Sequence, residues 1–187
     1  MKFLKNYDTS KNIRFKSFEF ALLEANRRNH KTLVETGVAR GKTKIFFFSK
    51  INWKDGMSTM IFSDYVKYVN GKLYSCDISS KNIKNAKKFT KMNKEFITFV
   101  QDDSLNFLSI FKKNIDFLYL DSLDAQFENA SSHQLEEIKL AIKNLKENSL
   151  VLLDDKGGKT NLSIDFMLRN NFQIINETRE QVLLSYK

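Results

Sequence analysis

Apolar positions along the chain follow two different spacings. In residues 12–29, Phe15, Phe18, Leu22 and Ala25 recur three or four positions apart, which predicts an amphipathic helix. Shorter runs, such as TLVET and SLVLLDD, are rich in β-branched and aliphatic residues and predict strands. The predicted strands are 32–36, 72–77, 96–100, 115–121, 149–155, 172–177 and 180–187. Further helices are predicted over 42–70, with a break near 52–56, and over 79–93, 103–113, 131–146 and 162–171.

The order of these elements predicts the fold class. Strands and helices alternate along almost the whole chain, as in an α/β three-layer sandwich with a mostly parallel sheet. The apolar run 150–153 suits a strand that is buried on both faces. Only Thr178 and Arg179 separate the last two strands, so we expect a hairpin and an antiparallel final strand. One domain over 1–187 is predicted, with the helical segment 1–30 packed on or capping the active site.

Composition narrows the class of protein. Apolar residues make up 42% of the 187 residues, and no apolar run approaches the roughly 18 residues of a membrane span. A single cysteine, Cys76, and the lack of an apolar N-terminal stretch favour a reducing, cytoplasmic location. The net charge of +9 would attract phosphates, but the lysines are scattered over several predicted helices, so charge alone does not favour nucleic-acid binding. The sequence does not decide the oligomeric state, and a homodimer is one candidate.

The stretch KTLVETGVARGKTK carries the most specific pattern. A predicted strand ends in Glu35, and a loop with Gly37 and Gly41 follows. Glycines let a ligand approach the backbone, and we expect the free N–H groups of a helix start to follow. A phosphate-binding loop ending in Gly41-Lys42-Thr43 would need four residues between its first glycine and the Gly-Lys pair, and only three are present. The dinucleotide pattern G-x-G-x-x-G is absent.

Acidic residues end the successive predicted strands. They are Glu35, Asp77, the pair Asp102-Asp103, Asp121 and the pair Asp154-Asp155. Because ligands of open α/β sheets bind at the carboxyl ends of the strands, we expect these acids to surround one site. Burying so many carboxylates together is costly without a cationic partner, so the site is expected to take a positively charged ligand.

The pattern E-x-G-x-x-x-G formed by Glu35, Gly37 and Gly41, with the acids at later strand ends, resembles class I S-adenosylmethionine-dependent methyltransferases. The resemblance covers residues 30–187 and implies a Rossmann-like, seven-stranded sheet with a C-terminal antiparallel hairpin strand. It also implies that the glycines pass under the methionine part of S-adenosylmethionine and that Glu35 helps to hold its ammonium group. Asp77 would accept hydrogen bonds from both ribose hydroxyls. The other implied cofactor contacts are Ile78, Asp103, Ser104 and Asp121.

The acids after the fourth and fifth predicted strands also resemble the metal site of small-molecule O-methyltransferases of the catechol type. By this resemblance Asp121, Asp154 and Asp155 would hold Mg²⁺ or Mn²⁺, which prefer oxygen ligands. The metal would lower the pKa of a substrate hydroxyl and orient it. The alternative is that Asp121 only assists cofactor binding and Asp155 caps a loop. Asp121 and His133 are the candidate catalytic residues.

The predicted function is therefore transfer of a methyl group from S-adenosylmethionine to a hydroxyl of a small molecule or sugar. Two alternatives stay open: a nucleotide hydrolase or kinase using Gly41-Lys42-Thr43, and a non-catalytic module that binds cofactor or RNA. Lys156 and Lys159, in the loop after the fifth strand, are predicted either to neutralise an anionic substrate or to be solvated.

Overall fold

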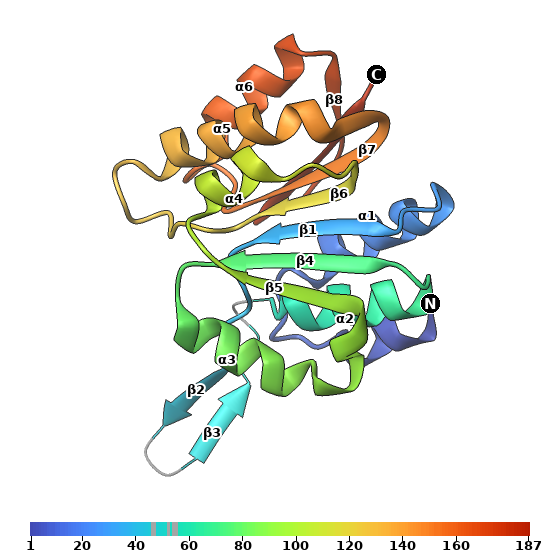
Figure 1. Cartoon of the computed structure of the whole chain (residues 1–187), viewed down its shortest axis with the longest axis vertical. Coiled ribbons are helices and arrows are strands. Elements are labelled where there is room, and N and C mark those ends of the chain that lie inside the picture. Colours follow the sequence, from blue (N-terminus) through green and yellow to red (C-terminus); the bar gives the residue numbers. More distant parts are fainter. Residues whose placement is uncertain (46–47, 52, 54–55) are drawn as a thin grey trace.

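A seven-stranded sheet forms the centre of the computed structural model, which describes residues 1–45, 48–51, 53 and 56–187 (Figure 1). Its strand order is β5-β4-β1-β6-β7-β9-β8. The strands are β1 Thr32–Thr36, β4 Lys72–Asp77, β5 Ile97–Gln101, β6 Ile115–Leu120, β7 Leu145–Asp154, β8 Phe172–Glu177 and β9 Gln181–Tyr186. The neighbours from β5 to β7 pair in parallel, and β9 pairs antiparallel with β7 and β8. The predicted Rossmann-like architecture and its antiparallel last strand are confirmed.

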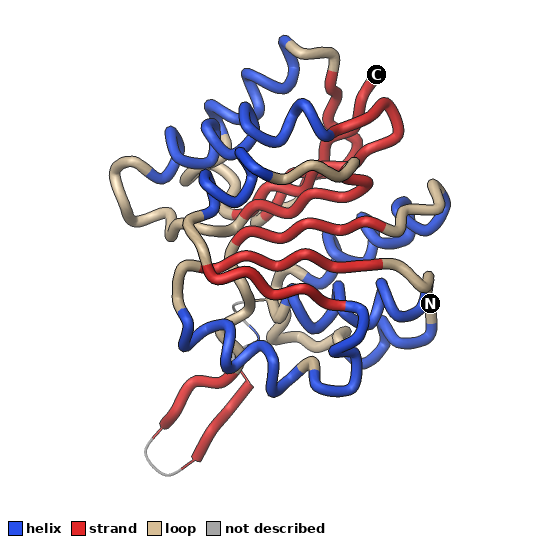
Figure 2. Tube along the Cα trace, viewed as in Figure 1, coloured by secondary structure: helices blue, strands red, loops and turns tan. Residues whose placement is uncertain are grey.

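Helices cover both faces of the sheet (Figure 2). They are α1 Phe15–Arg27, α2 Ser58–Tyr68, α3 Ser80–Phe89, α4 Ser104–Ile110, α5 Ala130–Ala141 and α6 Asn161–Arg169, with 3₁₀ turns at Lys2–Asn6, Lys91–Phe96 and Ile142–Asn144. Successive strand side chains point to opposite faces, so Leu33 packs with residues of α1 and α2 while its neighbour Val34 packs with residues of α4, α5 and α6. Two hydrophobic cores therefore hold the sheet between its helices.

The prediction of a largely helical segment from residue 42 onward is wrong for its first part. Strands β2 Lys42–Ile45 and β3 Phe48–Ile51 pair antiparallel in a separate hairpin, which projects away from the sheet in Figure 1. The run KTKIFFFSKI is rich in β-branched and aromatic residues, which favour extended backbone, and this preference outweighs the helical spacing. The helix α2 begins only at Ser58.

The chain turns before α2, as predicted near residues 52–56. Gly56 has φ +71° and its N–H donates to the carbonyl of Trp53, at 3.1 Å. Asn52, Lys54 and Asp55 lie outside the described residues. Among the residues that are described, no helix has the length and apolar character needed to cross a membrane.

Candidate active site at the carboxyl edge of the sheet

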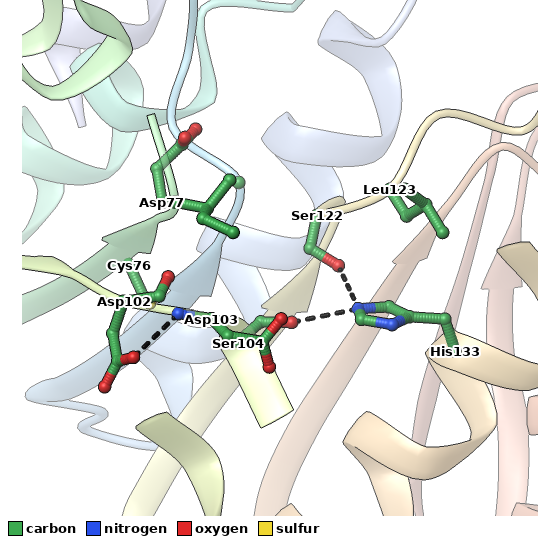
Figure 3. A pocket seen from close by; sticks show the side chains of 10 residues that line it. Cys76, Asp77, Asp102, Asp103, Ser104, Ser122, Leu123 and His133 are labelled. Atoms are coloured by element: carbon green, nitrogen blue, oxygen red, sulfur yellow. Dashed lines mark hydrogen bonds between the residues drawn. The ribbon is translucent and has the colours of Figure 1, made fainter. Parts of the chain in front are cut away.

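Two adjoining cavities open where the parallel strands end. The Ser104 cavity, of about 130 Å³, is lined by residues that follow β4, β5 and β6 and by His133 of α5 (Figure 3). The Arg40 cavity, of about 220 Å³, is lined by the loop after β1, the start of α3 and the segment after β6. Both cavities share Gly37, Asp77, Ile78, Ser122 and Leu123. Together they fall at the lower end of the roughly 300–1,000 Å³ that is usual for small-molecule sites.

Gly37 brings the ends of β1 and β6 into contact. Its φ is +82°, and its N–H donates to the carbonyl of Cys76 at 2.8 Å. A Cβ atom at this position would lie 2.1 Å from the carbonyl oxygen of Asp121. Gly41 also has a positive φ, but it lies at the start of the hairpin, beside the Phe89 ring, and lines neither cavity. Of the two predicted glycines, only Gly37 therefore borders the candidate site.

Asp77 lies between the two cavities at the end of β4. One carboxylate oxygen accepts hydrogen bonds from the N–H of Val38, at 3.1 Å, and from Asn82 Nδ2, at 3.2 Å. The other accepts from the N–H of Ser79 at 2.7 Å. These bonds fix the carboxylate between the loop after β1 and the start of α3. Asn82 Nδ2 also lies 3.4 Å from Oδ1, the oxygen that accepts from Ser79. Because each carboxylate oxygen offers two lone pairs, Oδ1 can take one further strong donor, whereas Oδ2 already accepts from Val38 and Asn82.

Glu35 is fully buried beneath the loop after β1 and lines neither cavity. Its carboxylate accepts hydrogen bonds from the hydroxyls of Ser58, Thr59 and Ser75, at 2.5, 2.9 and 2.5 Å. The Thr59 hydroxyl in turn accepts from the N–H of Ala39 at 2.8 Å. Burial raises the pKa of Glu35 to about 7, against the opposing effect of the three hydroxyls. Glu35 therefore anchors the loop from below, and the part in holding the ammonium group that the resemblance implied stays a prediction.

His133 belongs to a polar group on the wall of the Ser104 cavity (Figure 3). Its Nε2 lies 3.0 Å from Ser104 Oγ and 3.1 Å from Ser122 Oγ. On the far side, Glu137 Oε1 lies 3.9 Å from the same nitrogen, and burial raises the pKa of Glu137. His133 does not line the Arg40 cavity. These contacts join His133 to the two serines, and its predicted catalytic role stays a prediction.

Asp103 and Ser104 follow β5 and line the Ser104 cavity, and the cofactor contacts that the resemblance implied for both stay predictions. Asp103 is also the N-cap of α4, because its Oδ1 accepts from the N–H groups of Leu105 and Asn106 at 2.9 and 3.3 Å. Ile78 lines both cavities, with 72% of its surface exposed. These residues form an apolar and polar wall around one small space.

The acids that end β6 and β7 lie together, as predicted, but basic side chains contact them. Lys159 Nζ lies 2.8 Å from Asp121 Oδ1 and 3.1 Å from Asp155 Oδ2. Arg14, at the start of α1, contacts Asp154 at 2.7 Å and Asp155 at 2.9 Å. Burial and Asp154 raise the pKa of Asp121, and Lys159 opposes that rise. Lys159 is only 2% exposed, so the prediction of a solvated residue is wrong for it.

Several residues around the site were not found from the sequence. Ser75 is the register partner of Glu35 on the neighbouring strand, and a buried acid requires such donors, so this pair could have been inferred from strand alignment. Ser122 directly follows Asp121 and could have been included with it. Arg14 precedes the first helix, 140 residues from its partner Asp154, and carries no local signal.

The phosphate-loop alternative meets a structural obstacle. Phosphate-binding loops place their backbone N–H groups at the start of a helix. Here Lys42 and Thr43 begin strand β2, and the next α-helix among the described residues begins fifteen residues after Thr43, at Ser58. The expectation that a helix start follows the loop directly is therefore wrong.

A sheet of this order, with cavities at the carboxyl ends of its parallel strands, defines a Rossmann-like ligand-binding domain. A family model described as a methyltransferase domain matches residues 34–156, and the chain belongs to that family of class I S-adenosylmethionine-dependent methyltransferases. A comparison with curated protein sequences gives no match.

Solved structures share the fold at low sequence identity. The methyltransferase PaMTH1 of Podospora anserina, bound to S-adenosylhomocysteine (SAH), is 12% identical, with a TM-score of 0.66 over 97% of this chain and 81% of that chain. The O-methyltransferase of Bacillus cereus, in complex with SAH, is 10% identical, with a TM-score of 0.66 over 100% and 91%. An rRNA methylase of Streptococcus thermophilus is 13% identical, with a TM-score of 0.63 over 95% and 98%.

Proposed function

We propose that the chain binds S-adenosylmethionine across the two cavities and transfers its methyl group to an acceptor. The observation that carries this proposal is the position of Asp77, whose carboxylate lines both cavities. One ribose hydroxyl would take the remaining acceptor position on Oδ1, and the other would take the place of Asn82 Nδ2 on Oδ2, whose bond is long at 3.2 Å. Ile78, Asp103 and Ser104 would then surround the adenine in the Ser104 cavity. The methionine part would extend past Gly37 towards Asp121 in the Arg40 cavity.

The electrostatics of the Arg40 cavity support a cationic ligand. Asp77, Asp121 and Asp124 line it. Arg40 pairs with Asp124 at 2.5 Å and Lys159 pairs with Asp121 at 2.8 Å, so the net negative charge of this lining comes from Asp77. An excess of carboxylates favours the positive sulfonium and ammonium groups of S-adenosylmethionine over a triphosphate. Because methyl transfer is an in-line displacement, holding the acceptor oxygen against the sulfonium methyl supplies much of the acceleration.

The acceptor we favour is a hydroxyl of a small molecule or sugar. The mouth of the Arg40 cavity combines the apolar side chains of Leu123 and Phe127 with the carboxylate of Asp121. Apolar walls with few polar groups are usual for small-ligand sites. The B. cereus protein of the same fold is named an O-methyltransferase. Asp121 is our candidate for accepting the hydroxyl proton. A cytoplasmic location and a homodimer remain predictions.

The test is a melting experiment on the purified chain with SAH and with ATP. We expect SAH to raise the melting temperature, and ATP to leave it unchanged, because no helix start follows Gly41-Lys42-Thr43 to bind a triphosphate. Asp77→Asn should weaken SAH binding by about tenfold or more, since a hydrogen bond to a charged group contributes about 1.5–3 kcal/mol. The exposed Asp165→Asn is the matched control. Stabilisation by ATP alone would favour the hydrolase, and SAH binding without transfer to any acceptor would favour a non-catalytic module.

A second acceptor class, RNA, is favoured by one observation. Exposed lysines recur along α3 and the turn that follows it. They are Lys81, Lys84, Lys87, Lys88, Lys91 and Lys94. None forms an ion pair with another described residue. Like charges three or four positions apart destabilise a helix, so such a run of lysines suits a polyanionic partner. Ser79 and Asn82, at the start of α3, line the Arg40 cavity.

Charge reversal separates the two acceptor classes. If RNA is the acceptor, changing Lys81, Lys84, Lys88 and Lys91 to Glu should weaken binding of an rRNA fragment by more than about tenfold. The slope of log K against log salt should also fall by about 0.7 for each lost single-strand phosphate contact. The control reverses four other exposed lysines, Lys2, Lys5, Lys112 and Lys113. Equal RNA binding by both variants would count against RNA and leave the small-molecule acceptor.

A further inference from the structure

The three carboxylates at the ends of β6 and β7 have the residue types of a divalent-cation site. One oxygen from each of Asp121, Asp154 and Asp155 lies within 4.8 Å of the others. Hard cations such as Mg²⁺ prefer such oxygens, but Mg²⁺ requires six ligands in near-octahedral geometry. Whether these residues fit a metal therefore depends on how many of their oxygens are free.

Side chains of the same chain already use most of those oxygens. Lys159 contacts Asp121 Oδ1 and Asp155 Oδ2, and Arg14 contacts Asp154 Oδ1 and Asp155 Oδ1. Asp154 Oδ1 also accepts from Gln181 Nε2, at 2.8 Å. Of the buried oxygens in the cluster, Asp154 Oδ2 lacks a hydrogen-bond partner among the described residues. These residues do not fit a divalent ion as they are arranged.

Lys159 is held much as a metal ion would be. Its ammonium group donates to Asp121, at 2.8 Å, and to the carbonyl of Leu123, at 2.9 Å, and pairs with Asp155. These three oxygens match its three N–H donors, and the side chain is 2% exposed. A metal ion entering the cluster would have to displace this ammonium and leave it buried without a counter-charge, which is strongly unfavourable.

We propose that Lys159 is a built-in cation that takes the place of a divalent metal at this edge, with Arg14 neutralising the remaining acids. Lys159 joins the segment after β6, which lines the Arg40 cavity, to the loop after β7. It is therefore a positioning residue for Asp121, and the site operates without a metal. The proposal concerns the same site as the proposed function, but its test requires neither cofactor nor acceptor.

The test measures binding of Mn²⁺ alone by electron paramagnetic resonance. We expect the wild type to bind no Mn²⁺ below about 1 mM, in the range of the weakest protein cation sites. Lys159→Ala frees the oxygens of Asp121 and Asp155 and should gain one Mn²⁺ site, at least about tenfold tighter than any in the wild type. Adding Asp155→Ala to that variant should remove the gain. Lys156→Ala, which removes a lysine from the same loop that pairs with Glu177, should behave as wild type.

Two results would overturn the proposal. One is a stoichiometric Mn²⁺ site in the wild type that Asp121→Asn abolishes. The other is a folded Lys159→Ala protein that binds Mn²⁺ no better than Lys156→Ala. If Lys159→Ala does not fold, the melting temperature of the wild type tests the proposal instead. We expect the same melting temperature in EDTA and in Mg²⁺. A higher melting temperature in Mg²⁺ would refute the proposal. Stabilisation by SAH is measured separately, so failure here leaves the proposed methyl transfer unaffected.

Discussion

Gly37→Ala is expected to destabilise the protein by about 2–5 kcal/mol and to abolish SAH binding. The new Cβ would lie 2.1 Å from the carbonyl oxygen of Asp121 and 2.6 Å from its carbonyl carbon. Both are backbone atoms of the adjacent strand end, so neither can rotate away. Overpacking costs about 1–3 kcal/mol, and the positive φ of +82° adds about 1–2 kcal/mol for an L-residue. Urea denaturation, followed by circular dichroism, measures the loss.

Gly157→Ala is the matched control for that variant. Gly157 has nearly the same backbone conformation, with φ +80°, but a Cβ there would meet no atom within 4 Å. Its cost should therefore be the conformational strain alone, about 1–2 kcal/mol. The difference between the unfolding free energies of the two variants therefore measures the cost of the clash between a Cβ at position 37 and the backbone after β6. Equal destabilisation would mean that the strand ends separate easily and that Gly37 does not hold the cavity wall.

The sequence was sufficient to predict the sheet and the acids at its edge, because both depend on patterns that are local or repeated. The predicted strands at 32–36 and 72–77 coincide with β1 and β4, and their β-branched and aliphatic residues favour extended backbone. Once the strands are parallel, their carboxyl ends must share one edge. The proximity of Asp77, Asp103 and Asp121 to the two cavities follows from topology alone.

The predictions that failed depend on contacts between distant parts of the chain. The hairpin β2–β3 was expected to be helical, because spacing cannot distinguish a helix from a strand in a short apolar run. Lys159 was expected to be solvated or to face a substrate, because its sequence neighbours are glycines and lysines. Its partners Asp121 and Leu123 lie more than thirty residues earlier in the chain. Burial of a charge follows from such partners and not from local composition.

An acid at the position of Glu35 can act in two ways: it can contact the cofactor, or it can hold the loop after β1 in place. The pattern implied that its carboxylate contacts the cofactor, whereas the structure places it beneath the loop, bonded to the hydroxyls of Ser58, Thr59 and Ser75. The Thr59 hydroxyl also accepts a hydrogen bond from the N–H of Ala39, so it links Glu35 to the loop after β1. An acid at this strand end can therefore shape the cofactor loop without touching the ligand.

Replacing Glu35 with Gln is expected to change how stability depends on pH. The pKa of Glu35 is about 7 in the folded chain against 4.5 as its ordinary value, because burial disfavours the charged form. The folded state therefore binds the proton more tightly. The resulting stability is fully present below pH 4.5 and is lost as pH rises through 7. One pKa unit corresponds to about 1.4 kcal/mol, so the wild type should lose about 3 kcal/mol relative to Glu35→Gln over this range.

Urea denaturation of both proteins between pH 4.5 and pH 8 measures that difference, and other titrating groups cancel because both proteins contain them. The exposed Glu95→Gln should follow the wild type at every pH. A constant difference between wild type and Glu35→Gln would contradict the raised pKa. The same variant also separates the two roles of Glu35. If the carboxylate only supports the loop, SAH affinity at pH 6 should change by less than about threefold, whereas loss of a direct charged hydrogen bond would reduce it by about tenfold or more.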